Sequence, residues 1–337
     1  MKALLRPLLR IADSEIGYVR RGFRGGDPRA VANVEAIGAA FLTGYHTALD
    51  APDVAAAIAG LEAGDRSLCG FRYEGAAMAL YLLDRLLPGR RDRFDQLLAG
   101  RGGEHVYMAY VGAGWAHARL PFGLRGALAR RDPLLRWLML DGYGFHQGFF
   151  HWHSSVEGAQ QVPARVRGYA RRAFDQGLGR SLWFVEGHEA ERIAATIARF
   201  APERRADLWA GVGLAATYAG GVERAALEHL RKLADAAGGW LAQGSAFAAA
   251  ARCRAGNAVP HNDLACDVLC GMNAAAAAEI VVKIRAELPA DDAAQPAYEI
   301  WRRRTRERMT HPHYDAGHRA SASPLLPPLQ LQNAGAL

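Results

Sequence analysis

Hydrophobic and polar positions divide the chain into two alternating kinds of segment. Shorter segments such as EAERIAATIARF carry apolar residues at helical spacing and charges on the remaining face, whereas longer segments such as RRADLWAGVGLAATYAGG are apolar almost all round. A helix without a polar face has to be covered on several sides. The pattern therefore predicts apolar helices inside the molecule and shorter, charged helices outside them.

Periodicity and helix-breaking residues place these helices along the chain and predict no strand. Helices are expected at 28–49, 53–63, 71–87, 91–100, 105–119, 133–152, 163–186, 188–200, 203–220, 222–236, 238–254, 262–287 and 297–309. The Pro and Gly residues between them leave short connections, which favour antiparallel neighbouring helices.

A glycine recurs at steps of 27 to 37 residues, and each is followed four residues later by another small residue. These glycines are Gly44, Gly75, Gly112, Gly144, Gly177, Gly211, Gly244 and Gly271. Helical-hairpin repeats of the tetratricopeptide type advance by about 34 residues. Glycine inside a helix costs about 1 kcal/mol relative to alanine, so close approach of a neighbouring helix is the expected compensation. We predict an all-α, tetratricopeptide-like helical-hairpin repeat solenoid.

Composition divides the chain into three parts. We expect an N-terminal arm at 1–27, a single helical repeat domain at 28–309, and an extended or disordered tail at 310–337 that is rich in Pro, Ser and Ala. No segment is long and apolar enough to span a membrane, and the N-terminus lacks the pattern of a signal peptide. The sequence thus predicts a soluble, cytoplasmic protein whose four cysteines are buried, reduced thiols.

The formal net charge of +7 includes one dense run of arginines in the segment WRRRTRERM, near residue 304. A nucleic-acid interface usually interleaves such a run with aromatic residues or presents it as a stripe. Glutamates dilute this run, so we expect a solvated helix face, with phosphate binding as the alternative, and no nucleic-acid partner.

Candidate catalytic residues come from the register of the glycines. His46 and His146 each stand two residues after a glycine, Glu74 directly precedes one, and Arg180 follows one at the third position. If these side chains line an inner groove, they would form an acid–base set with an anion-binding arm. Core histidines are the alternative. Further candidates for lining a substrate groove are Trp115, Tyr143, Gln176, Trp183, Tyr218 and Gln243.

Metal and cofactor motifs are weak. His151 and His153 could bind a metal together only if the helix ends near Phe150, and the alternative is an aromatic patch. His311, His313 and His318 form a loose tract without fixed spacing. Phosphate-binding and dinucleotide motifs are missing, so no cofactor is indicated by motif.

The segments GFRYEGAAMAL, DGYGFHQGFFHW, RRAFDQGLGRSLWFVEG and DLWAGVGLAATYAGG resemble an uncharacterised bacterial family encoded beside polyketide synthases in enediyne biosynthesis clusters. The resemblance runs from about residue 20 to about residue 310, and RAFDQGLGRSLWFV is its most specific part. It implies a setting but no reaction. The implied ligand is a linear polyene or polyyne made by the synthase, and proteins associated with the synthase are possible partners.

Two functions of different class follow from this resemblance. The protein could bind or convert the polyene in an apolar groove, with His46, Glu74, His146 and Arg180 as the residues involved. It could instead be a non-catalytic scaffold that recruits other biosynthetic proteins, as helical repeats commonly do, and it could form oligomers. Convergence of the four side chains in a pocket of roughly 300 to 1,000 Å³ would favour the first function. An open face with exposed aromatic residues would favour the second.

Overall fold

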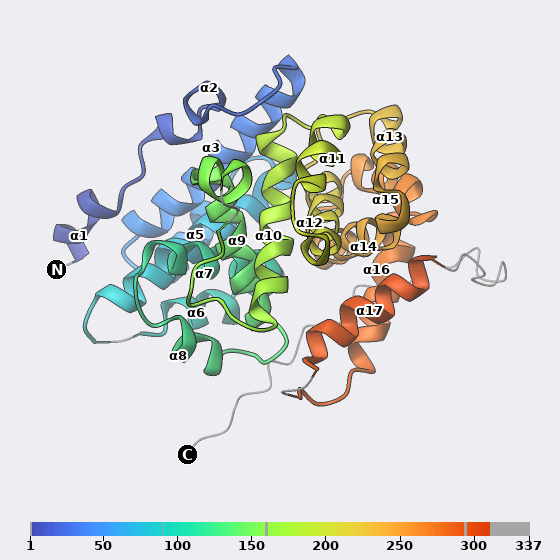
Figure 1. Cartoon of the computed structure of the whole chain (residues 1–337). Coiled ribbons are helices and arrows are strands. Elements are labelled where there is room, and N and C mark those ends of the chain that lie inside the picture. The colour runs from blue at the N-terminus through green and yellow to red at the C-terminus, as the bar shows by residue number, and fades with distance from the viewer. Residues whose placement is uncertain (1, 90, 159–160, 293–294, 311–337) are drawn as a thin grey trace.

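The computed structural model describes residues 2–89, 91–158, 161–292 and 295–310, and these residues form helices and no strand (Figure 1). In chain order the α-helices are α1 (Lys2–Leu9), α2 (Tyr18–Arg21), α3 (Pro28–Asp50), α4 (Val54–Leu61), α5 (Cys69–Leu86), α6 (Arg93–Ala99), α7 (Val106–Arg119), α8 (Leu124–Ala129), α9 (Arg136–Phe150), α10 (Ala170–Val185), α11 (Ala190–Ala198), α12 (Pro202–Ala219), α13 (Arg224–Ala234), α14 (Gly238–Arg254), α15 (Pro260–Cys270), α16 (Ala274–Ala286) and α17 (Ala297–Thr310). Short 3₁₀ turns stand at Asp13–Ile16, Arg66–Leu68, Arg101–Gly103 and Asp235–Ala237, and a π-helical turn at His153–Glu157.

The long apolar helices form an inner row. Helices α3, α5, α7, α9, α10, α12, α14 and α16 pack in this order, each on the next, and lie side by side in Figure 1. Almost every residue of α5 is buried, which matches its lack of a polar face. The shorter helices α11, α13 and α15 pack on one another and keep their charged faces in solvent. The predicted division into inner and outer helices is confirmed for these elements.

Glycines bring the backbones of the inner helices together. A Cβ atom on Gly177 of α10 would overlap the carbonyl oxygen of Asp141 on α9, and one on Gly144 of α9 would overlap that of Phe174 on α10. Seven of the eight predicted glycines make such contacts. Gly271 does not, because it ends α15 in the left-handed conformation, with φ +73°, and a Cβ there would meet no atom within 4 Å.

The helix contacts also correct the register of the repeat. In α10 and α12 the contacts alternate at spacing two: Gly177 faces the preceding helix α9 and Gly179 the following helix α12, while Gly211 faces α10 and Gly213 faces α14. The small residue two positions after the first glycine is therefore a second contact point. This requirement for close packing explains why the position is small in most units.

Local chain chemistry explains where several helices begin and where one predicted helix breaks. Asp27 caps α3 through the backbone amides of residues 29 and 30, with Pro28 at the first helical position. The helix predicted at 262–287 is two helices, because Gly271 terminates α15 and the Asn273 side chain caps α16. The segment predicted at 163–186 becomes helical only at Ala170, and α8 lies where no helix was predicted.

The N-terminal segment is held against the helices rather than apart from them. The Arg6 guanidinium donates to the carbonyl of Leu49 at the end of α3, and the indole of Trp152 donates to the carbonyl of Arg21. The expected tail at 310–337 lies outside the described residues beyond Thr310.

Contacts between distant inner helices enclose the middle of the molecule. The Asn33 amide on α3 donates to the carbonyl of Ala219 at the end of α12 at 3.3 Å, and the Arg252 guanidinium on α14 donates to the carbonyl of Ser67 at 2.5 Å.

Among the described helices, none is individually long and apolar enough to cross a membrane. Helices α15 and α16 reach that length only together, and they meet at 69°.

Candidate binding pocket

Glu74 and Arg180 lie beside the same apolar pocket, although 106 residues separate them in sequence. Glu74 comes from α5 and Arg180 from α10, and both side chains are almost fully buried. The Nη1 atom of Arg180 donates to Oδ1 of Asp141, on α9, at 2.5 Å. The inner row of helices therefore brings two carboxyl groups and one guanidinium into one region. We call Glu74, Asp141 and Arg180 the central cluster.

Two narrow apolar compartments meet at Arg180. The first is lined by Phe41, Trp115, Phe145, Phe149 and Phe184 beside Glu74, and the second by Met108, Val111, Leu138, Phe247 and Trp301 beside Asp141. Each has a volume of about 40 Å³. Aromatic rings dominate the first compartment, where the rings of Phe41 and Trp115 stack at 4.4 Å. The charged cluster thus stands between two apolar spaces.

A larger surface pocket of about 400 Å³ lies next to these compartments. It shares Phe71 with the first compartment and Tyr218 with the second. The two rings contact each other edge to face, with centroids 5.3 Å apart, and the Arg252 guanidinium lies 4.0 Å from the Tyr218 ring centroid. Phe71 and Tyr218 therefore lie between the surface pocket and the two apolar compartments.

Several polar atoms around the compartments are buried without a hydrogen-bond partner among the described residues. They are Oε1 of Glu74, Nε of Arg180, Nε1 of Trp115 and Oη of Tyr218. A buried polar group without a partner costs about 1 to 3 kcal/mol, and native proteins normally satisfy such groups with protein atoms, water or a ligand. Similar atoms occur elsewhere in the described residues, but these four also line the apolar compartments.

The charges of the central cluster are unequally compensated. Burial raises the pKa of the Glu74 carboxyl group to about 7, although the positive charge of Arg180 opposes this increase and Asp141 adds to it. Burial disfavours the charge of Arg180, but the adjacent Asp141 carboxylate keeps the pKa of Arg180 above its usual value. A carboxyl group that titrates near neutral pH can both accept and donate a proton.

A buried network of hydrogen bonds connects the central cluster to α17. The Gln176 amide donates to Oδ2 of Asp141 at 2.8 Å and to the Tyr298 hydroxyl at 3.1 Å. Gln176 therefore fixes the carboxylate that pairs with Arg180. This network joins α9 and α10 to α17.

The arginine run on α17 differs from its predicted role as a solvated face. Arg302 is 1% exposed and donates to Asp207 at 2.7 Å and to Gln243 at 3.3 Å. Its guanidinium also lies 3.4 Å from Glu299. Buried charges need such partners, because leaving one unpaired costs several kcal/mol. One arginine of the run therefore joins α17 to α12 and α14, whereas Arg308 is exposed.

The two candidate histidines lie away from the central cluster. His146 is buried against Trp115, with ring centroids 5.6 Å apart, and burial lowers its pKa to about 3. His46 is half-buried on α3, and its Nε2 accepts from the backbone amide of Ile11 at 3.4 Å. Neither lines the three pockets, so the structure brings together Glu74 and Arg180 but not the histidines.

The predicted groove residues also divide. Trp115 and Tyr218 line the compartments, whereas Gln176 and Gln243 belong to the polar network. The Tyr143 hydroxyl accepts from Arg165 at 2.8 Å, and the Trp183 indole donates to the carbonyl of Gly220 at 3.0 Å. Neither Tyr143 nor Trp183 lines any of these three pockets.

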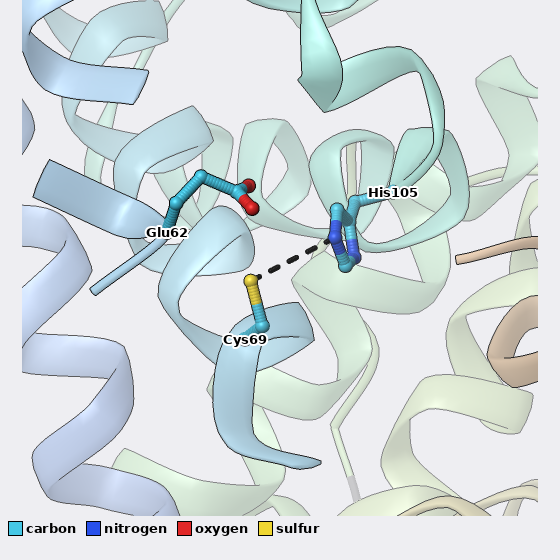
Figure 2. A group of neighbouring side chains, drawn as sticks. All are labelled: Glu62, Cys69 and His105. Carbon is cyan, nitrogen blue, oxygen red and sulfur yellow. Dashed lines mark hydrogen bonds between the residues drawn. The ribbon is translucent and has the colours of Figure 1, made fainter. Parts of the chain in front are cut away.

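Within the described part of the chain, the structure does not place the predicted metal candidates His151 and His153 in a group of three ligands, but it places three other residues in one. Helix α9 ends at Phe150, yet His153 is exposed and bonds to Glu157 at 2.8 Å, and no third ligand joins it and His151 among the described residues. Glu62, Cys69 and His105 do form such a group (Figure 2). Sequence inspection missed it because the His105 position lies one unit after Cys69, without a short-range motif.

The central cluster also contains residues that the sequence did not single out as a set. Asp141 belongs to a polar and aromatic stretch, but it pairs with Arg180, which lies 39 residues later on the next helix. Outside the central cluster, Asp207 and Arg302 pair over 95 residues. Buried charged positions on otherwise apolar helices are the signal that could have indicated them, since such positions need partners.

Fold and site together define a class: an all-helical protein with a charged cluster buried between apolar compartments. Residues 1–309 match the family described as "Protein of unknown function (DUF1702)", and the chain belongs to this family. Comparison with curated proteins and with solved structures found no match. The family description names no activity.

Proposed function

We propose that this protein binds, and takes part in processing, a linear polyene or polyyne made by a polyketide synthase in an enediyne antibiotic pathway. The observation that carries this proposal is the set of partnerless polar atoms, Glu74 Oε1 and Arg180 Nε among them, buried between two aromatic and aliphatic compartments. Ligand sites typically combine apolar walls with a few convergent polar groups. A conjugated chain is narrow and apolar, whereas its terminal carboxyl group or thioester is polar.

The shape of the compartments supports a thin ligand. Each holds only about 40 Å³, so a polyene can enter only if side chains that line the compartments move. Phe71 and Tyr218 stand between the compartments and the surface pocket, which makes this pair the entrance that the proposal requires. Glu74 would then exchange a proton with the bound chain near neutral pH.

Of the four candidate side chains only Glu74 and Arg180 line a compartment, and its volume of about 40 Å³ is below the roughly 300 to 1,000 Å³ typical of a ligand pocket. In the part of the chain that the structure describes, the scaffold alternative lacks the open face of exposed aromatic residues that it requires. Among the described residues the exposed large hydrophobic side chains are Leu8, Val19 and Phe122, and none of them lines a pocket. The aromatic residues beside the compartments are buried instead, which suits a small ligand better than a protein partner.

A binding titration tests the proposed function. The probe is a conjugated polyene carboxylic acid, whose fluorescence increases in apolar surroundings. Leu214 lines the second compartment and is half-buried, so Leu214→Trp should fill the compartment and weaken binding at least tenfold. The matched control is Leu233→Trp, at a half-buried position on α13 that lines none of the three pockets. Equal binding by both variants, or no saturable binding by the unaltered protein, would refute the proposal.

The pathway assignment has its own test. Deleting the gene from a producing strain should stop formation of the enediyne and lead to accumulation of a polyene. Complementation with Leu233→Trp should restore the product, whereas complementation with Leu214→Trp should not. Unchanged product after deletion would contradict the pathway assignment while leaving polyene binding in vitro intact.

We also propose that the helix pairs are units of a tetratricopeptide-like solenoid. Side chains that bond across neighbouring inner helices support this, because their partners stand one unit apart: 35 residues for Gln176 and Asp141, and 36 for His117 and Tyr81. Such a solenoid is stabilised by nearest-neighbour interfaces.

The contacts of Asn33 with Ala219 and of Arg252 with Ser67 add to these interfaces, because they join units that are not neighbours. Substituting an interface glycine by alanine should destabilise the protein in urea denaturation, and unchanged stability would argue against close packing of the units.

A further inference from the structure

Three potential metal ligands come together where α4, α5 and α7 meet. Glu62 directly follows α4, Cys69 is the first residue of α5, and His105 directly precedes α7. Their ligand atoms all lie within 4.8 Å of one another, and Figure 2 shows the carboxylate, thiol and imidazole turned toward one another. Cys69 Sγ and His105 Nε2 are 3.8 Å apart.

We propose that Glu62, Cys69 and His105 bind a divalent transition-metal ion, with Zn²⁺ as the best match. Thiolate, imidazole and carboxylate together form a ligand set that suits zinc, whereas magnesium and calcium prefer oxygen ligands alone. Zn–S and Zn–N bonds of about 2.3 and 2.0 Å in a tetrahedron place the S and N atoms about 3.6 Å apart. The observed 3.8 Å needs only a small inward movement.

Neighbouring side chains already orient the ligands. The Tyr73 hydroxyl donates to Oε1 of Glu62 at 2.6 Å, and the Tyr73 ring stacks on the His105 imidazole with centroids 4.3 Å apart. One residue thus positions two of the three ligands, as residues around a metal site commonly do. Cys69 and His105 are buried, so their positions are set by the packing of α5 and α7.

Two cations contact the site. The Arg72 guanidinium lies beside the Cys69 thiol and donates to the carbonyl of Leu61 at 2.8 Å. Nε of Arg101 lies 3.3 Å from Oε2 of Glu62, but the Arg101 side chain is 53% exposed and can turn into solvent when a metal arrives. The Glu62 side chain is 33% exposed, so it can move toward the ion and leave a fourth coordination position facing water. Three protein ligands with an open position are the arrangement of zinc sites that bind water or substrate.

Metal titration of the purified full-length chain tests this proposal, with Co²⁺ as a spectroscopic probe and Zn²⁺ as the competitor. We expect one Co²⁺ per chain, a thiolate-to-cobalt charge-transfer band, and displacement of that band by one equivalent of Zn²⁺. Cys69→Ser should abolish the band, whereas Cys253→Ser, which removes a half-buried thiol elsewhere, should leave it unchanged.

Two milder variants keep the test independent of folding defects at buried positions. Glu62→Gln should weaken Zn²⁺ binding at least tenfold, and Arg101→Gln should strengthen it because one competing cation is gone. Zn²⁺ should raise the melting temperature of the unaltered chain and of Cys253→Ser more than that of Glu62→Gln. A charge-transfer band that persists in Cys69→Ser, no Co²⁺ binding by the unaltered chain, or equal Zn²⁺ affinity in Glu62→Gln would overturn the proposal.

Discussion

Replacing Glu74 by glutamine removes a buried carboxyl group whose ionisation works against folding. Burial raises the pKa of Glu74 from 4.5 to about 7, with Arg180 opposing the increase. The unfolded chain releases this proton near the lower value, so stability is fully present below pH 4.5 and is lost as pH rises through about 7. One pKa unit corresponds to about 1.4 kcal/mol, which makes the loss about 3 kcal/mol.

Urea denaturation across this pH range measures the effect. The free energy of unfolding of Glu74→Gln, minus that of the unaltered chain, should increase by about 3 kcal/mol between pH 4.5 and pH 8. Subtracting the two curves cancels the contributions of all other titrating groups. Glu228→Gln, at an exposed position, is the control and should give a constant difference. If the Glu74→Gln curve runs parallel to that of the unaltered chain, Glu74 is not held in the uncharged form and the reasoning fails.

Two substitutions test the packing and the polar network by the same denaturation assay. Gly211→Leu should destabilise the protein by about 3 kcal/mol or more, because even its Cβ would overlap the backbone of α10. The control Gly26→Ala meets no atom within 4 Å and should change stability by less than about 0.5 kcal/mol. Equal effects of the two substitutions would argue against close helix contact. Asp207→Asn leaves Arg302 without its closest counter-charge and should cost about 3 to 5 kcal/mol, whereas Glu223→Gln removes only an exposed ion pair and should cost less than about 1 kcal/mol. A small effect of Asp207→Asn would show that Glu299 compensates for the lost charge.

The sequence predicted the helices well because their signals are local. An apolar segment with Asp27 before it and a breaker after it determines a helix almost unaided, whereas the cap at Asn273 is hidden inside a longer apolar segment. The glycines were informative for the same reason, since a residue that weakens a helix needs a packing explanation. Gly271 was assigned to the wrong role because a left-handed helix end and a packing contact both select glycine.

The site was predictable only in part because its members come from different units. Glu74 and Arg180 were identified from their place beside interface glycines, a register that each inner helix preserves. His46 and His146 share that register argument, yet the space next to them is filled by Ile11 and Trp115. Which face of a helix lines a cavity depends on the rotation of that helix and on contacts between distant inner helices. The local sequence pattern predicts neither.

The central cluster contains two carboxyl groups and one cation, so only one carboxyl group can be fully compensated. Asp141 accepts from Arg180 and from Gln176, whereas burial raises the pKa of Glu74, and the charge of Arg180 and the Trp115 indole oppose that increase. The negative charge of Asp141 itself contributes to that increase.

Asp141→Asn should therefore lower the pKa of Glu74 from about 7 toward 4.5, because Arg180 then has Glu74 as its nearest carboxylate. The measurement compares Asp141→Asn with the double variant that also carries Glu74→Gln. The difference between their unfolding free energies should vary with pH by less than the roughly 3 kcal/mol expected in the native background. An unchanged pH dependence would mean that burial alone sets the proton affinity of Glu74, and the cluster could not then use Asp141 to tune it.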